Sequence, residues 1–158
     1  KNHSFLLRIF HSLLQIRPDA VLLLAGEGEL LEQMKAFAKE LGIASKVRFL
    51  GARGDANRLY SAMDVFCLPS FYEGLPVVMI EALANGLTCV VSSCVTSELN
   101  SFCVHQLSLS ESTEAWAAAL SCTSRTQELP QALAKRFDIH HTVALLESFY
   151  LRQLNTKA

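Results

Sequence analysis

The chain has 158 residues, of which 51% are hydrophobic, and its 14 Lys and Arg residues nearly balance its 15 Asp and Glu residues. This length and apolar content suit a single domain with a buried core. The near-zero net charge argues against a protein that binds nucleic acid through bulk charge. The longest apolar runs are far too short to cross a bilayer, so no transmembrane segment is expected.

Helix and strand patterns alternate along the chain. Residues 2–15 carry apolar side chains at helical spacing, and residues 20–26 form a short apolar run typical of a buried parallel strand. Further helices are predicted at 29–42, 55–63, 76–86, 112–120 and 140–154, and further strands at 46–51, 64–70 and 88–93, with a weak fifth strand near 104–109. Asp55 is the expected N-cap of its helix, Gly42 and Gly86 are expected helix ends, and residues 121–131 are expected to form a surface loop or short helix.

This alternation predicts an α/β fold with a Rossmann-like, doubly wound parallel sheet and helices on both faces, in a single domain over residues 1–158. In such a sheet, ligands bind beyond the carboxyl ends of the strands. The rule selects four loops, at residues 26–29, 51–55, 70–76 and 92–98.

Two glycines follow the first predicted strand, at Gly26 and Gly28. They resemble the start of a dinucleotide fingerprint, but Leu31 holds the place of the third glycine, so a nicotinamide cofactor is not expected. Two interpretations stay open: a plain tight turn, or a loop kept small so that a ligand or another domain can approach.

The segment Glu73-Gly74-Leu75-Pro76 precedes a predicted helix. Gly74 permits unusual backbone angles, and Pro76 presets the start of the helix. The free N–H groups of the first helical turn would then form a site for a diphosphate. The alternative is that Glu73 only caps the helix and meets solvent.

Glu81 lies inside the same, nearly all-apolar helix, and no cation stands three or four residues away from it. A carboxylate buried there would need donors, because burial without a partner is costly. Two hydroxyls of one ribose would serve, and so would a structural hydrogen bond to a neighbouring loop.

No metal or cofactor site is expected. The chain has no Asp-x-Asp pair to hold a divalent ion on a diphosphate, and its five histidines show no metal-ligand spacing. Its five cysteines form no CxxC pair and are expected to be reduced, mostly buried thiols of a cytosolic protein. No G-x-S-x-G motif accompanies Ser70 or Ser92, so acyl transfer is not indicated, and Trp116 is expected in the core.

Residues 64–93, DVFCLPSFYEGLPVVMIEALANGLTCVVSS, resemble the donor-binding signature of the retaining glycosyltransferases of the group 1 family. The hallmark of that signature is two glutamates separated by seven residues, matched by Glu73 and Glu81. The flanking segments 22–30, 47–64 and 90–98 are also similar to the family in order and spacing, and the resemblance covers about residues 1–120. Residues 110–120 are similar to its bacterial capsule and exopolysaccharide branch.

The resemblance implies one half of a GT-B architecture, in which two Rossmann-like domains face each other. It implies that Glu73 approaches the donor sugar and acts in catalysis, and that Glu81 holds the ribose. The remaining donor-binding residues that it implies are Lys1, Gly26, Arg53, Gly74, Leu75, Pro76 and Val77. Lys1 and the amides near Gly74 would bind the diphosphate, Arg53 would line the base, and Gly26 would face the cleft.

The implied function is transfer of a hexosyl group from a nucleotide-diphosphate sugar, with uridine as the expected base, to a glycan or lipid-linked acceptor with retention and without a metal. The implied location is the cytoplasm, with the full enzyme peripheral to the inner membrane face. The chain departs from the family where Gly86-Leu87-Thr88 replaces Gly-x-Pro. It also starts at Lys1 without Met or signal peptide, so we expect a fragment that lacks the acceptor domain and the first strand of this domain. Two rivals stay open: a truncated, non-catalytic nucleotide-sugar-binding module, and half of a sugar-nucleotide epimerase.

Overall fold

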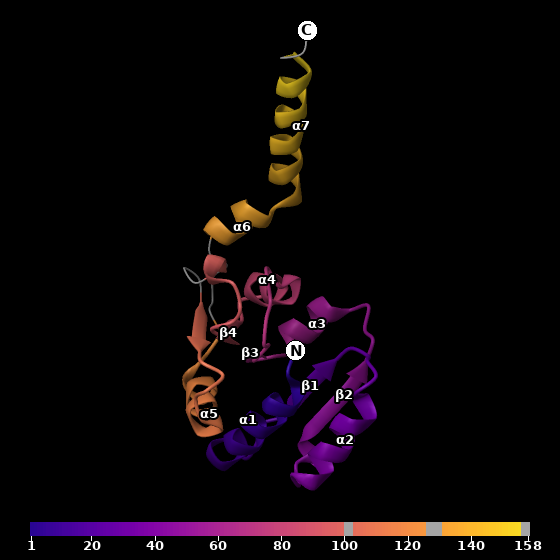
Figure 1. Cartoon of the computed structure of the whole chain (residues 1–158), viewed down its shortest axis with the longest axis vertical. Helices are drawn as coiled ribbons and strands as arrows, with labels where there is room; N and C mark the ends of the chain where they lie inside the picture. Colours follow the sequence, from indigo (N-terminus) through magenta and orange to yellow (C-terminus); the bar gives the residue numbers. More distant parts are fainter. Residues whose placement is uncertain (100–102, 126–130, 156–158) are drawn as a thin grey trace.

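The computed structural model describes residues 1–99, 103–125 and 131–155. Its helices and strands alternate along most of the chain (Figure 1). The strands are β1 (Leu22–Ala25), β2 (Val47–Gly51), β3 (Val65–Leu68), β4 (Thr88–Ser92) and β5 (Val104–Leu107). The helices are α1 (His3–Ile16), α2 (Leu31–Glu40), α3 (Ala56–Ser61), α4 (Val77–Ala84), α5 (Thr113–Cys122), α6 (Gln131–Phe137) and α7 (Ile139–Asn155), with short 3-10 turns η1 (Ala44–Lys46) and η2 (Ser97–Leu99).

The predicted elements are confirmed, including the weak fifth strand. The predicted surface stretch at 121–131 is described as far as residue 125, and residues 126–130 lie outside the described part of the chain. The short helix α6, which begins at Gln131, was not predicted as an element of its own.

All strand pairs are parallel, as predicted, but the described strands form two sheets instead of one. β1 pairs with β2, starting with Leu22 opposite Val47, and β3, β4 and β5 form a second sheet in that order. The predicted parallel arrangement is confirmed, and the described strands divide it between two sheets. Neither β1 nor β3 has a strand on its other edge among them.

Helices cover β4 on both faces. Val90 packs with Ile9 of α1 and Trp116 of α5, whereas its neighbour Val91 belongs to the cluster that contains Met79 of α4. Successive residues of a strand point to opposite faces, so this division places α1 and α5 on one side and α4 on the other. All five residues of β4 are buried, and the predicted α/β class with helices on both faces is confirmed.

Helix α1 ties the two sheets together. Leu7 and Phe10 pack in the cluster of β2 and α2, while Ile9 packs against the second sheet. Trp116 is fully buried, as predicted; its indole N–H donates to the carbonyl of Ser108, 3.1 Å away. Through these clusters α1 packs against both sheets.

Helix α4 ends where the sequence predicts. Gly86 has a φ of 75°, a conformation that favours glycine, and the chain turns there into β4. The replacement of the family's Gly-x-Pro by Gly86-Leu87-Thr88 leaves this strand in place, with Leu87 and Thr88 both buried.

No helix in the described ranges combines the length and apolarity needed to cross a membrane. All five cysteines are free thiols, and Cys94 and Cys122 are exposed.

Candidate functional site

The four loops predicted at the ligand edge meet in two pairs. The N–H of Gly26 donates to the carbonyl of Gly51 at 2.7 Å, which joins the loops after β1 and β2. The N–H of Glu73 approaches the carbonyl of Cys94 at 3.4 Å, which joins the loops after β3 and β4. Gly26 has a φ of 132°, a conformation that other residues rarely adopt, and a Cβ placed there would meet no atom within 4 Å. The first loop is thus a glycine-dependent turn with open space beside it.

Glu73 and Lys1 are in direct contact. Nζ of Lys1 lies 2.6 Å from Oε1 of Glu73, and the hydroxyl of Ser70 donates to the same oxygen at 3.2 Å. The Glu73 side chain is 19% exposed, so the carboxylate is neither buried nor free in solvent. The Lys1 hydrogen bond is the main reason why the pKa of Glu73 lies below its usual value. The structure therefore brings together two residues that the sequence predicted for one site.

Two buried serines are linked to Glu73 by a chain of hydrogen bonds. Ser92, at the end of β4, donates its hydroxyl to the carbonyl of Ser70, and neither serine is exposed to solvent. Ser70 in turn reaches Glu73. The sequence analysis weighed these serines only for acyl transfer; their position at the carboxyl ends of adjacent strands was the signal that could have revealed this supporting role.

Glu81 is exposed, which corrects the expectation that it is buried in an apolar helix. Helix α4 buries Met79, Ala82 and Leu83 on one face, whereas Val77 and Glu81 stand one turn apart on the other. Oε2 of Glu81 accepts a hydrogen bond of 3.0 Å from the hydroxyl of Tyr60. A structural hydrogen bond is therefore present, although its donor lies on helix α3 and not on a loop as considered above, and it leaves one carboxylate edge facing solvent.

Tyr60 was missed by the sequence analysis, which counted it only as part of a short helix. It lies on α3, is 7% exposed, and its ring stands edge-on to Phe66 at a centroid distance of 6.1 Å. Burial, and then the hydrogen bond to the Glu81 carboxylate, raise the pKa of the Tyr60 hydroxyl well above its usual value. The hydroxyl is thus a permanent donor to Glu81 near neutral pH.

The N-terminus of α4 is open. Pro76 is the N-cap, one residue before the helix, and no side chain caps the helix. The backbone N–H groups of Val77 and Val78 have no acceptor among the described residues. Such N–H groups, with the helix dipole, favour an anion.

Gly74 does not have the unusual backbone angles expected of it. Its φ is outside the positive range, and a Cβ placed there would meet nothing within 4 Å. What glycine supplies at this position is open space in front of the helix. Three apolar side chains close to Gly74 in sequence are exposed: Phe71 is 69% exposed, Leu75 42% and Val77 64%.

Arg53 and Asp55 form a two-pronged ion pair. Nε and Nη2 of Arg53 each lie 2.8 Å from an oxygen of the Asp55 carboxylate. The expected cap is therefore absent, since Asp55 occupies the N-cap position of α3 without a side-chain hydrogen bond to that helix. Arg53 holds the pKa of Asp55 below its usual value. Arg53 stays at the ligand edge, but its guanidinium has a protein partner already.

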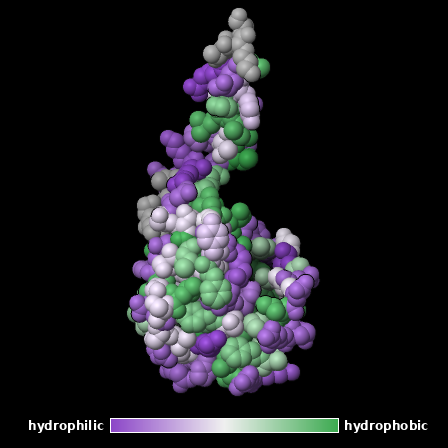
Figure 2. Space-filling model, in the orientation of Figure 1, coloured by the Kyte–Doolittle hydropathy of each residue, from purple (hydrophilic) through white to green (hydrophobic). Residues whose placement is uncertain are grey.

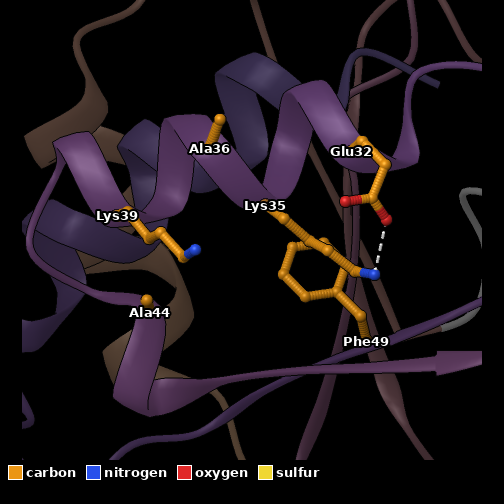
Figure 3. Close-up of a pocket in the computed structure, with 6 residues that line it drawn as sticks. All are labelled: Glu32, Lys35, Ala36, Lys39, Ala44 and Phe49. Carbon is orange, nitrogen blue, oxygen red and sulfur yellow. Dashed lines mark hydrogen bonds and ion pairs between the residues drawn. The ribbon is translucent and has the colours of Figure 1, made fainter.

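A hollow of about 340 Å³ lies elsewhere, between α2, η1 and β2 (Figure 3). Glu32 and Lys35 form an ion pair of 2.7 Å at its rim, next to the ring of Phe49. None of the predicted site residues lines it, so it is separate from the candidate site. Among the described residues, no group of three or more His, Cys, Asp or Glu side chains gathers as metal ligands would.

Comparison with known proteins identifies the family. The profile of the family described as "Glycosyl transferases group 1" matches residues 1–136. The putative glycosyltransferase EpsF of Bacillus subtilis is 35% identical over 158 residues, which cover 95% of this chain and 41% of EpsF. The UDP-Gal:alpha-D-GlcNAc-diphosphoundecaprenol alpha-1,3-galactosyltransferase of Escherichia coli is 38% identical over 77 residues, or 48% of this chain and 20% of that protein.

A solved structure shares the fold. Anabaena Alr3699/HepE in complex with UDP-glucose superposes with a TM-score of 0.77 at 22% identity, over 95% of this chain and 45% of that one. The chain thus spans less than half the length of the relatives that it matches.

Proposed function

The chain belongs to the group 1 glycosyl transferase family, and from this we propose that it is the donor-binding half of a retaining hexosyltransferase. The donor is a nucleotide-diphosphate sugar with uridine as its base. The acceptor is a glycan or a lipid-linked sugar, and the full enzyme works in the cytoplasm, peripheral to the inner membrane face, in assembly of a bacterial capsule or exopolysaccharide. The Escherichia coli relative, whose name specifies a UDP-sugar and a diphosphoundecaprenol acceptor, supports this choice of substrates.

One observation carries the proposal: an uncapped helix N-terminus stands between two carboxylates at the ligand edge. Glu73 precedes α4, and Glu81 lies on its exposed face. The free amides between them suit a diphosphate, and the open carboxylate edge of Glu81 suits two adjacent ribose hydroxyls. Amides of Gly74, Leu75 and Val77 are the proposed phosphate donors.

The proposed chemistry follows from where charge develops. When the bond between the sugar and the phosphate breaks, negative charge grows on the diphosphate, and fixed amides and a cation stabilise it. Lys1 is the proposed cation, and because its ammonium contacts Glu73, both groups would lie together at the reacting end of the donor. Glu73 contacts the sugar hydroxyls near the reacting carbon, and attack from the side of the departing diphosphate would retain the configuration.

We further propose that transfer needs no metal. The amides of α4 and the ammonium of Lys1 would take the role that a divalent ion plays on a diphosphate in other enzymes. The absence of an Asp-x-Asp pair from the sequence agrees with this proposal.

The free edges of β1 and β3 are evidence for a further strand beside them, beyond the described residues. The three leucines of β1 and the first three residues of β3 are only half-buried, although both strands are apolar, whereas β4 has strands on both sides and is fully buried. A parallel strand that preceded α1 would reach β1 by a right-handed crossover and fill the free edge. We propose that the longer protein supplies this strand.

The exposed apolar side chains of helix α7 are evidence for a second part of the longer protein. It projects from the body of the molecule (Figure 1), and green, apolar side chains are visible along it (Figure 2). Its exposed apolar side chains are Ile139, Val143, Leu145, Leu146, Phe149, Tyr150, Leu151 and Leu154. Eight exposed apolar side chains on one helix mark an interaction site. We propose that the acceptor half of the longer protein covers them.

Two rival functions differ in testable ways. A truncated, non-catalytic module would bind donor and never turn it over, even when joined to an acceptor half. A sugar-nucleotide epimerase half would convert a free nucleotide-sugar without an acceptor. Family membership and the Glu73–Glu81 pair favour a transferase over the epimerase.

The experiment that tests the proposed site is an NMR titration of the ¹⁵N-labelled chain with UDP. The amide signals of Gly26, Gly74, Leu75 and Val77 should shift in a saturable way, while those of Lys35 and Lys39 beside the separate hollow stay in place. Shifts that cluster at the hollow, or no saturable shift at all, would overturn the assignment.

A further inference from the structure

Arg125 follows helix α5 on a segment that is fixed to the second sheet. The hydroxyl of Thr88, at the start of β4, donates to the carbonyl of Ser124 at 2.7 Å. Thr88 is 5% exposed and Ser124 is exposed, so this anchoring hydrogen bond is partly buried. The segment is far from the ligand edge in sequence, and none of the motifs discussed above includes it.

The guanidinium of Arg125 binds the carboxyl ends of two helices at once. Nη1 donates to the carbonyls of Tyr60 (3.1 Å), Ser61 (3.1 Å) and Met63 (2.6 Å), at the end of α3. Nη2 donates to the carbonyl of Asn85, the C-cap of α4, at 2.6 Å. Carbonyls at the end of a helix lack partners within the helix and carry the negative end of its dipole, which a guanidinium satisfies.

The same two helices carry the Tyr60–Glu81 hydrogen bond. Tyr60 lies on α3 and Glu81 on α4, and the carbonyl of Tyr60 is itself one of the acceptors of Arg125. Asn85 adds to this arrangement, because its side-chain amide donates to the carbonyl of Glu81 at 2.9 Å. Helix α3 has only six residues, so it depends on outside contacts to keep its position.

We propose that Arg125 is a positioning residue of the donor site: by joining the ends of α3 and α4, it holds the Tyr60 hydroxyl on the Glu81 carboxylate. Fixing one carboxylate oxygen leaves the other aimed at solvent, where a ribose would lie. The structural part of this inference stands on the hydrogen bonds above, and its consequence for binding rests on the proposed function.

Arginine suits this position because its fork presents separate nitrogens to two helices. A lysine ammonium is a point charge and would reach one set of carbonyls only. Replacement by lysine therefore keeps the charge and loses the bridge, which separates the two effects in an experiment.

The test compares Arg125→Met and Arg125→Lys with Arg48→Met as a control. Arg48 also donates to a backbone carbonyl, that of Ser45 at 2.7 Å, but it lies on β2 beside η1. Two quantities are measured: NMR contacts between the Tyr60 ring and the Glu81 side chain, and the dissociation constant for UDP.

In the Arg125 variants we expect the Tyr60–Glu81 contacts to weaken and the affinity for UDP to fall five- to tenfold, with no rescue by lysine. Arg48→Met should change neither quantity. In a Tyr60→Phe background, Arg125→Met should weaken the affinity for UDP by less than a further twofold, because the contact that Arg125 positions is already absent. Unchanged contacts, full rescue by lysine or strictly additive losses would overturn the inference.

Failure of the proposed function and failure of the Arg125 inference give different results. If the wild-type chain binds no nucleotide, the proposed function fails, while the Tyr60–Glu81 contacts still decide whether Arg125 positions this pair. If Arg125→Met does not fold, Thr88→Val provides a second test, because it removes the hydrogen bond that anchors the same segment. It should also weaken the contacts between Tyr60 and Glu81. Unchanged contacts in a folded Thr88→Val variant would then count against the inference.

Discussion

The hydroxyl of Tyr60 donates a hydrogen bond of 3.0 Å to Oε2 of Glu81, and this bond joins α3 to the exposed face of α4. It explains how an exposed glutamate can have a fixed orientation. A side chain that is free in solvent would have to be ordered by its ligand at an entropic cost, whereas Glu81 is ordered in advance. The central question is whether a nucleotide uses that orientation.

Tyr60→Phe removes the hydroxyl and leaves the ring packed against Phe66. We expect the free energy of unfolding to fall by about 0.5–1.5 kcal/mol, the net value of one hydrogen bond, because the exposed Glu81 regains water as a partner. Urea denaturation measures this loss. Leu59→Ala on the same helix provides a comparison for general loosening of α3, and a loss in Tyr60→Phe above about 3 kcal/mol would show that the hydroxyl has a larger structural role.

The ion pair of Glu73 and Lys1 makes stability depend on pH. Folding lowers the pKa of Glu73, mainly through the hydrogen bond from Lys1. The stabilisation is therefore present above the unfolded pKa of about 4.5 and is lost as the pH falls through the lower, folded value. Glu73→Gln should lower the free energy of unfolding at about pH 7 by no more than about 1 kcal/mol, because Lys1 is half-exposed.

Below the folded pKa of Glu73, the wild type and Glu73→Gln should be equally stable. Urea titrations at a series of pH values measure the difference, with Glu40→Gln on α2 as a control for the loss of one negative charge. If the difference in free energy of unfolding between the wild type and Glu73→Gln grew as the pH fell, the pH dependence would have the opposite sign. That result would contradict the assigned ion pair.

Two cysteines should differ sharply in reactivity. Cys94 is exposed beside Glu73, whereas Cys89 is buried in β4, where burial raises its pKa to about 12. Iodoacetamide at about pH 8 should alkylate Cys94 within minutes and leave Cys89 intact until the chain unfolds. UDP should slow the labelling of Cys94 severalfold, as mass spectrometry would show. Labelling of Cys94 that UDP leaves unchanged, while Cys122 reacts as before, would place the nucleotide elsewhere.

Chelation should leave nucleotide binding unchanged. If amides and Lys1 neutralise the diphosphate, excess EDTA should alter the affinity for UDP by less than twofold, and added Mg²⁺ should not raise it. Fluorescence-detected titrations with and without EDTA measure the ratio. A tenfold weaker complex in EDTA would show that a divalent ion belongs to the site.

Much of the fold follows from local sequence patterns. The apolar runs of β1, β3 and β4, and the glycine after α4, identify elements that depend on neighbouring residues only. The division into two sheets was not predictable, because it depends on which strand lies beside β1 and β3, and no local pattern records that. The helix α6 was missed since its seven residues carry too short a pattern.

The candidate site was predictable to a similar degree. Strand order placed Glu73 at the ligand edge, and the family resemblance added Glu81, but the sequence could not show that Glu81 is exposed, since an apolar helix can bury either face. Tyr60, which donates to Glu81, is 21 residues away from it in sequence, and Arg125, which joins the ends of α3 and α4, is 44 residues away. Contacts at such separations arise from tertiary packing, and only the structure shows them.

The most direct measurement is a calorimetric titration of the chain with UDP, beside Glu81→Ala and a control, Glu32→Gln. We predict a dissociation constant on the order of 0.1–1 mM for the wild type and the control, because the proposed acceptor half of the cleft is not part of this chain, and no measurable binding by Glu81→Ala. Equal binding by the wild type and Glu81→Ala would contradict the donor-site assignment. A folded wild-type chain that ignores uridine, guanosine and adenosine diphosphates alike would contradict the claim that it binds a donor at all.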